Sequence, residues 1–384
     1  MTAAPPRFEQ VRHRMREIGV DVMLLSHGAD LPWLTGYRAM PLERLTLLVL
    51  PAEGEPELLV PALEAARVPD PHGAFSVRPW MDTEDPIELA ATSISRTDQA
   101  GGRSGLSVAI SDRAWAVSLL GLQHRLATAT WSPVSVVTGP LRARKDAHEL
   151  AALRAAAAAA DRVAAQLQAG DLALLGRSEA DVSADIARRL VAEGHQRVNF
   201  AIVGSGPNGA SPHHEPGPRT IAAGDVVVCD FGGTLAPAHD GADHTGVGYC
   251  SDITRTVVVG RPDPQILDYY AVLHAAQQAG FEAARAGVAA GDVDTACRRV
   301  IAEAGLGQWF IHRTGHGIGI DEHEDPYIVA GNTDVLLQGH VFSIEPGIYL
   351  PGCFGMRLED IVVVGPDSPE RLNTADRRLV ELDA

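Results

Sequence analysis

Residues 315–360 contain three short motifs: Gly-His-Gly-Ile-Gly-Ile-Asp-Glu-His-Glu (315–324), Phe-Ser-Ile-Glu-Pro-Gly-Ile-Tyr (342–349) and Gly-Met-Arg-Leu-Glu-Asp (355–360). One residue in each motif is a candidate metal ligand, namely His316, Glu345 and Glu359. The glycines on both sides of His316 allow the backbone to close around a ligand, because glycine has no side chain to block the approach. We expect this segment to form strands and turns that carry part of a metal site.

Two further candidate ligands lie upstream of this segment. Asp230 belongs to the apolar run Val-Val-Val-Cys-Asp-Phe-Gly-Gly, and Asp252 belongs to Tyr-Cys-Ser-Asp-Ile-Thr-Arg-Thr. Two aspartates, two glutamates and one histidine suit a pair of divalent ions bridged by carboxylates. The five side chains come from distant parts of the chain, so the fold would have to bring them together.

Strand periodicity places several of these residues on inward faces. Alternate residues of a strand share a face, so Arg357, Glu359 and Ile361 are expected together. Asp252 shares a face with Thr254 for the same reason. A buried carboxylate must be paired or bound to a cation, because burying a bare charge costs too much free energy. One such carboxylate, taken alone, is more often part of a structural ion pair, and it is the combination of five candidate ligands that indicates a metal site.

Length and composition limit the class of protein. A chain of 384 residues with 46% hydrophobic residues is long enough for two folded domains. The formal charge of −17 argues against nucleic acid and anionic membrane as main partners, because phosphate contacts need a basic surface. Residues 1–10 do not resemble a secretory signal, and no apolar run is long enough to span a membrane. The four cysteines are scattered, which favours reduced thiols in a cytoplasmic protein.

The first part of the chain, residues 1–139, alternates helical and strand patterns. An amphipathic helix is expected at 7–18, with strands at 20–25, 45–50, 58–60, 108–110 and 134–137. This alternation is typical of an α/β layer domain. No nucleotide-binding fingerprint accompanies it.

The second part, residues 140–384, is expected to begin at the turn Gly139-Pro140. Asp146 and Glu149 have the spacing of a capping box, and the helix they open continues through an alanine tract. A second capping box is predicted at 178–181. Residues 225–231 and 251–259 are expected to pair as antiparallel strands, and helices are expected at 264–285 and 292–304.

The ordered set of Asp230, Asp252, His316, Glu345 and Glu359, each within its motif, resembles the pita-bread metallopeptidases (family M24). It is most similar to their branch of Xaa-Pro dipeptidases (prolidases) and aminopeptidases P. The segment from Phe8 to Tyr37 also resembles the creatinase-like N-terminal domain of that branch. The resemblance therefore covers nearly the whole chain, and it implies a creatinase-like α/β domain followed by a pita-bread catalytic domain.

The resemblance implies a role for each site residue. Asp230 would bind one divalent ion through both oxygens, Asp252 and Glu359 would bridge two ions, and His316 and Glu345 would each complete the shell of one. A water between the ions would attack the peptide bond, and Glu345 would carry its proton to the leaving proline nitrogen.

Three further residues are implied to act on substrate. His213 would polarise or anchor it, and His323 would do likewise and help to stabilise the oxyanion. Arg357 would orient the bridging carboxylate or bind a substrate carboxylate through two hydrogen bonds. His214 and His340 are expected to be exposed, and Tyr349 is either a wall of the pocket or a hydrogen-bond donor.

The activity implied is hydrolysis of the Xaa-Pro bond, above all in dipeptides, by a homodimer. Manganese is the expected metal because oxygen ligands dominate, with cobalt or zinc as alternatives. Aminopeptidase P activity on longer peptides is the close alternative function. A metal-free creatinase-type hydrolase and a non-catalytic binding module would each lack the carboxylate ligands, which are present here.

The chain departs from the family pattern between Asp230 and Asp252. Residues 234–248 form a longer hairpin than the family usually has there, and they look like an insertion. The histidines and aspartates in it are interpreted as a polar hairpin tip rather than as a second metal site. The insertion is expected to affect the choice of substrate more than metal binding.

Overall fold

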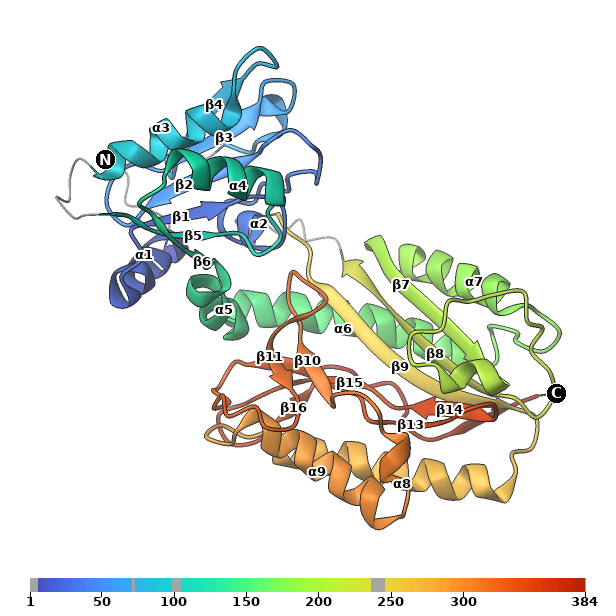
Figure 1. Ribbon diagram of the computed structural model, residues 1–384. Helices are drawn as coiled ribbons and strands as arrows, with labels where there is room; N and C mark the ends of the chain where they lie inside the picture. The colour runs from blue at the N-terminus through green and yellow to red at the C-terminus, as the bar shows by residue number, and fades with distance from the viewer. Residues whose placement is uncertain (1–5, 71–72, 99–104, 236–245, 384) are drawn as a thin grey trace. The chain divides into compact units, whose positions relative to one another are not determined.

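The computed structural model describes residues 6–70, 73–98, 105–235 and 246–383 (Figure 1). These residues form two compact units, the first built mainly from residues up to Arg142 and the second mainly from Ala143 onward. The predicted domain boundary, Gly139-Pro140, lies within helix α5 (Ser135–Ala143), and a division at that point stays a prediction. Most of the predicted insertion, residues 236–245 with its histidines and aspartates, lies outside the described residues.

The N-terminal unit is built around a six-stranded mixed sheet with the order β4-β3-β2-β1-β5-β6. The central strand β1 pairs antiparallel with β2 and parallel with β5, and its residues are all buried. Helices α3 and α4 cover one face of the sheet and α1 the other (Figure 1). The strands are β1 (Val22–Leu25), β2 (Leu47–Pro51), β3 (Glu57–Pro61), β4 (Ser76–Trp80), β5 (Ser107–Ile110) and β6 (Thr130–Pro133). The helices are α1 (Pro6–Ile18), α2 (Asp30–Thr35), η1 (Ala65–Arg67), α3 (Pro86–Asp98) and α4 (Ala116–Arg125), with α5 after β6.

The prediction of a strand at 134–137 is wrong. The chain leaves β6 at Pro133 and enters α5 at Ser135. Val134 and Val137 are fully buried, and their spacing of three residues matches one face of a helix as well as it matches a short apolar strand. The apolar run is too short for its periodicity to distinguish a helix from a strand.

In the C-terminal unit, a four-stranded sheet with the order β17-β9-β8-β7 carries the first half of the site. Helices α6 and α7 pack on it through a shared apolar core. The elements are α6 (Ala147–Gln168), α7 (Glu179–Ala192), β7 (His195–Ser205), η2 (Gly206–Ala210), β8 (Val226–Leu235), β9 (Cys250–Val259) and β17 (Val380–Leu382). Asp146 caps α6 in the predicted capping box with Glu149, and Ser178 caps α7.

A five-stranded sheet with the order β11-β10-β12-β15-β16 and the hairpin β13-β14 carry the second half of the site. Helices α8 and α9 cover this half, so the strands of the unit lie between two helix pairs (Figure 1). The elements are α8 (Pro264–Ala283), α9 (Ala290–Glu303), η3 (Gly307–Trp309), β10 (Gly315–Gly317), β11 (Glu324–Ile328), β12 (Val341–Ile344), β13 (Gly347–Leu350), β14 (Phe354–Arg357), β15 (Asp360–Val363) and β16 (Glu370–Arg371). Among the described helices, none combines the length and apolar character needed to cross a membrane.

Candidate metal centre

Asp230 and Asp252 reach the site from neighbouring antiparallel strands. The register of β8 and β9 pairs Asp230 with Thr254 and Gly232 with Asp252. Since residues two apart in a strand share a face, both aspartates point to the same side of the sheet. The long apolar runs that precede and follow them bury the other face against α6 and α7. The strand pairing that the sequence predicts therefore fixes the first two carboxylates.

The other three candidate ligands come from the second sheet and its connections. His316 lies in β10, Glu345 directly follows β12, and Glu359 lies between β14 and β15. A side chain on either glycine beside His316 would collide with main-chain oxygens of the neighbouring strands. Only glycine allows the strands around His316 to approach this closely.

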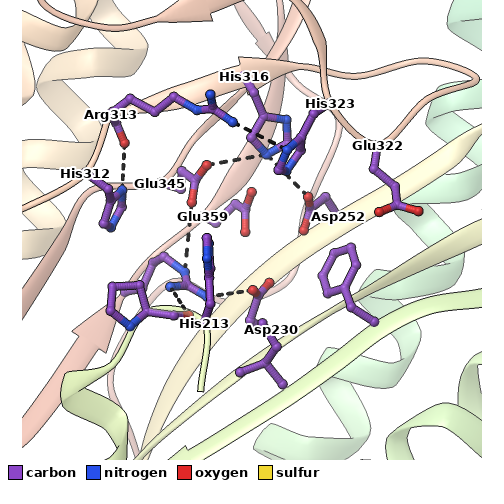
Figure 2. A pocket seen from close by; sticks show the side chains of 14 residues that line it. His213, Asp230, Asp252, His312, Arg313, His316, Glu322, His323, Glu345 and Glu359 are labelled. Atoms are coloured by element: carbon purple, nitrogen blue, oxygen red, sulfur yellow. Dashed lines mark hydrogen bonds and ion pairs between the residues drawn. The ribbon is translucent and has the colours of Figure 1, made fainter. Parts of the chain in front are cut away.

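All of the predicted site residues line one cavity of about 470 Å³ (Figure 2). They are His213, Asp230, Asp252, His316, His323, Glu345, Arg357 and Glu359. His316 Nε2 lies 3.4 Å from Glu345 Oε1 and 3.7 Å from Asp252 Oδ2. Ligand atoms of Asp252, His316 and Glu359 all lie within 4.8 Å of one another. Side chains separated by more than a hundred residues in sequence thus meet at one point.

The carboxylates in this cavity are crowded and incompletely paired. Asp252 Oδ1 and Glu359 Oε1 are buried and have no hydrogen-bond partner among the described residues. Burial, followed by repulsion from neighbouring carboxylates, raises the pKa of both groups well above the usual range. Burial also raises the pKa of Glu345 to about 7. Buried oxygens that lack donors are unfavourable without a cation, so this donor set fits divalent metal ions.

His316 is prepared to act as a neutral ligand. Burial, and then the nearby His323 and Arg313, lowers the pKa of His316 to about 3. Its Nδ1 lies 3.1 Å from the carbonyl oxygen of Gly317. Because a carbonyl can only accept, Nδ1 carries the proton, and the lone pair of Nε2 faces the carboxylates. A hydrogen bond of this kind fixes the ring of a metal-binding histidine.

Arg357 connects the two halves of the site. Its guanidinium donates to Asp230 Oδ2 at 2.6 Å and to the Thr254 hydroxyl at 3.0 Å, and it lies 4.0 Å from Glu345 Oε2. The residue is only 2% exposed. Arg357 thus contacts both Asp230, from the first sheet, and Glu345, from the second half of the site.

Two histidines of the predicted set lie at the edge of the carboxylate group. The ring centroids of His323 and His316 are 3.9 Å apart, and burial, followed by repulsion from Arg313, lowers the pKa of His323. His213 enters the cavity from the opposite side, below Glu345 in the view of Figure 2. Both side chains can therefore contact a molecule bound over the carboxylates.

His312, which no motif indicated, also lines the cavity and contacts Tyr349. Tyr349 accepts a hydrogen bond from Arg357 at 2.9 Å, and its oxygen lies 2.9 Å from His312 Nε2. Burial, and then Arg357, lowers the pKa of His312 to about 4, so the neutral ring can accept a hydrogen bond from the Tyr349 hydroxyl. Tyr349 is therefore a hydrogen-bonding link. The only sequence signal for His312 was its position four residues before His316.

Comparison with known proteins extends over both units. Residues 150–366 match the model of metallopeptidase family M24, and residues 7–144 match the creatinase/prolidase N-terminal domain.

Two curated relatives cover almost the whole chain. The probable dipeptidase PepE of Mycobacterium tuberculosis is 44% identical over 95% of this chain and 92% of its own length. The Xaa-Pro dipeptidase of Lactobacillus helveticus is 34% identical over 97% of this chain and 98% of its own. Among solved structures, a prolidase from Thermococcus sibiricus is 37% identical and superimposes with a TM-score of 0.89, covering 100% of both chains.

Proposed function

Because the chain belongs to metallopeptidase family M24, we propose that it hydrolyses the Xaa-Pro bond of dipeptides with the help of two divalent metal ions. The family matches confirm the expected combination of a creatinase-like N-terminal domain with a pita-bread catalytic domain. Relatives and solved structures named Xaa-Pro dipeptidase or prolidase support the dipeptide specificity. The observation that carries the proposal is the convergence of five candidate ligands in one cavity. Two of them, Asp252 and Glu359, have a buried oxygen without a hydrogen-bond partner among the described residues.

The five candidate ligands would hold two divalent ions. Asp230, Asp252, His316, Glu345 and Glu359 supply mainly carboxylate oxygens with one imidazole nitrogen, a set that two neighbouring divalent ions can share. The bound ions would lower the pKa of a water and so provide a nucleophile near neutral pH. Since oxygen ligands dominate, we propose manganese, and cobalt or zinc would also suit the site.

The surrounding residues would bind substrate and move the proton. Glu345 is a candidate proton carrier to the proline nitrogen, because it lies among the ligands and its carboxylate also accepts from Ser343. His213 and His323 reach the cavity from opposite sides, so each can donate to a substrate oxygen. Arg357 is nearly fully buried between Asp230 and Tyr349. We propose that it orients Asp230 rather than binding substrate directly.

Several properties of the whole protein belong to the proposal as well. We propose a cytoplasmic homodimer, for which the support is the resemblance to the family and the four free cysteines. Proline-containing dipeptides are the proposed substrates. Gel filtration with light scattering tests the dimer, since a monomeric mass at micromolar concentration would contradict it.

A comparison of substrates tests the proposed activity. The manganese-loaded protein is expected to release proline from Ala-Pro faster than it cleaves the first bond of Ala-Pro-Ala, and to leave Ala-Ala intact. Faster cleavage of Ala-Pro-Ala would favour the aminopeptidase P alternative. Inertness toward both proline peptides, with two ions bound per chain by metal analysis, would overturn the Xaa-Pro specificity.

A further inference from the structure

Glu179 is a fully buried carboxylate that the proposed mechanism does not use. It lies in the first turn of α7 and is 0% exposed. Its oxygens accept hydrogen bonds from Ser205 N and Oγ at 2.8 and 2.6 Å, from Asn208 Nδ2 at 3.1 and 3.0 Å, and from His214 Nε2 at 2.8 Å. Burial opposes ionisation of Glu179, but these hydrogen bonds outweigh it and hold its pKa below the usual value. Glu179 is therefore an ionised acceptor around which the segment after β7 is folded.

His214, which the sequence analysis expected to be exposed, belongs to this network. Its side chain is only 20% exposed and contacts Glu179. Its neighbour His213 points instead into the cavity (Figure 2). Two consecutive side chains thus point in different directions, one toward α7 and one toward the candidate metal centre.

A second contact fixes the other side of His213. The carbonyl oxygen of Pro212 accepts a hydrogen bond from Arg357 Nη1 at 3.2 Å, and Arg357 also binds Asp230. His213 is therefore held between an anchor at Pro212 and an anchor at His214. Both anchors act on residues directly adjacent to it in the chain.

His213 needs such anchors because it has no regular secondary structure to hold it. The chain between η2 and β8 makes only turns and bends around this residue. Loop side chains vary more in position than those in strands, yet a shift of about 1 Å in a residue that contacts substrate can cost roughly 100-fold in rate.

We propose that Glu179 and His214 are positioning residues that hold His213 in the cavity, where it contacts substrate. This inference rests on the proposed function, because it assigns the two residues to the substrate contact of the same site. Neither residue lines the cavity. They are therefore expected to act only through His213.

A double-mutant cycle tests this coupling. His214→Ala and Glu179→Gln are each expected to lower kcat/KM for Ala-Pro by about 10-fold, with two manganese ions still bound and the fold intact by circular dichroism. His213→Ala should lose at least as much. The double variant His213→Ala/His214→Ala should be no worse than His213→Ala, because residues that act as one unit are not additive. His13→Ala, which removes a 3.1 Å histidine–glutamate contact on the exposed face of helix α1, is the matched control and should keep full activity.

Three outcomes would overturn the coupling. These are full activity of His214→Ala, losses that multiply in the double variant, and full activity of His213→Ala in a wild-type background that cleaves Ala-Pro. If Glu179→Gln fails to fold, the cycle with His214→Ala alone decides. If the wild-type protein cleaves no dipeptide, the proposed function fails separately. Crystal structures then decide the positioning role, which is supported if His213 leaves the cavity in His214→Ala and contradicted if it stays.

Discussion

Thr254 joins the two sheets at the level of single side chains. Its hydroxyl lies 3.0 Å from Asp230 Oδ1 and 2.7 Å from Glu359 Oε2. One hydroxyl can donate only one hydrogen, so it satisfies one of these carboxylates at a time, and Arg357 donates to its oxygen. Thr254 therefore supports candidate ligands from both halves of the site, and a substitution of Thr254 should disturb the positions of both Asp230 and Glu359.

Removing one bridging candidate should disable the site. Asp252→Asn replaces a carboxylate with an amide that is a poor metal ligand. We expect fewer than two manganese ions per chain and a loss of more than about 100-fold in kcat, because even residues that merely support a ligand cost 10–100-fold. Metal analysis and Ala-Pro hydrolysis measure the two effects. Asp268→Asn, on the exposed surface of α8, is the control, and a fully active Asp252→Asn would refute the dinuclear site.

At the scale of elements, a buried ion pair connects strand β9 to β15. Arg255 and Asp360 are both 0% exposed, and their charged groups lie 2.7 Å apart. Arg255 also donates to the main-chain oxygens of Thr254 at 3.0 Å and Glu359 at 2.6 Å. Glu359 itself makes one of these contacts through its main chain, and Asp252 is two residues before Thr254 in β9. The pair therefore connects the strand that carries Asp252 to the start of β15, directly after Glu359.

Breaking this pair should destabilise the metal-free C-terminal unit. Arg255→Met leaves Asp360 with Arg371 at 3.2 Å and the amide of Gln277 at 3.1 Å as its remaining partners. We expect a loss of about 3 kcal/mol in the free energy of unfolding, the lower end of the cost of breaking a buried pair. Arg154→Met is the matched control, since its pair with Glu370 is about half exposed and should contribute less than about 1 kcal/mol. Urea unfolding followed by circular dichroism measures both. Equal effects of the two substitutions would show that the buried pair does not stabilise the strand contact.

At the scale of the whole molecule, the site should make stability depend on pH and metal. Burial in the folded state raises the pKa of Glu345 to about 7 and raises the pKa values of Asp252 and Glu359 well above the usual range. A raised pKa means that the folded state holds protons that the unfolded state has lost. The stability that these carboxyl groups contribute is therefore present below their unfolded pKa values and disappears as the pH rises through their folded ones.

Since folding raises the pKa of Glu345 to about 7, we expect its carboxyl group to contribute less stability to the metal-free protein as the pH rises from about 5 to about 7. The slope should be about 1.4 kcal/mol per pH unit for each proton concerned. Histidines act in the opposite direction, since burial lowers the pKa values of His316 and His312 and the unfolded state takes up their protons first. The difference between the metal-free and the manganese-loaded protein therefore isolates the carboxyl groups, because the ligands of the loaded protein are deprotonated. Thermal unfolding at both pH values measures this, and parallel slopes with and without metal would contradict it.

How much of the structure was predictable differed from residue to residue. The capping box at Asp146 and the antiparallel strands that carry Asp230 and Asp252 were predicted correctly, because a cap or a strand period depends on neighbours in the sequence. The run at 134–137 was misassigned because its few apolar residues fit two periods. His214 and His340 were expected to be exposed, yet the first pairs with Glu179 and the second is 8% exposed.

The family and its two-part α/β fold could be predicted from the sequence, because five motifs with candidate ligands follow one another in the order typical of the family. The eight predicted site residues that line the cavity could be named as well, but not His312. Only the tertiary structure decided which of them touch, such as Arg357 with Asp230 and Thr254 with Glu359. These contacts join residues about a hundred positions apart, and they follow from how two sheets pack against each other. No local period in the sequence reports that packing.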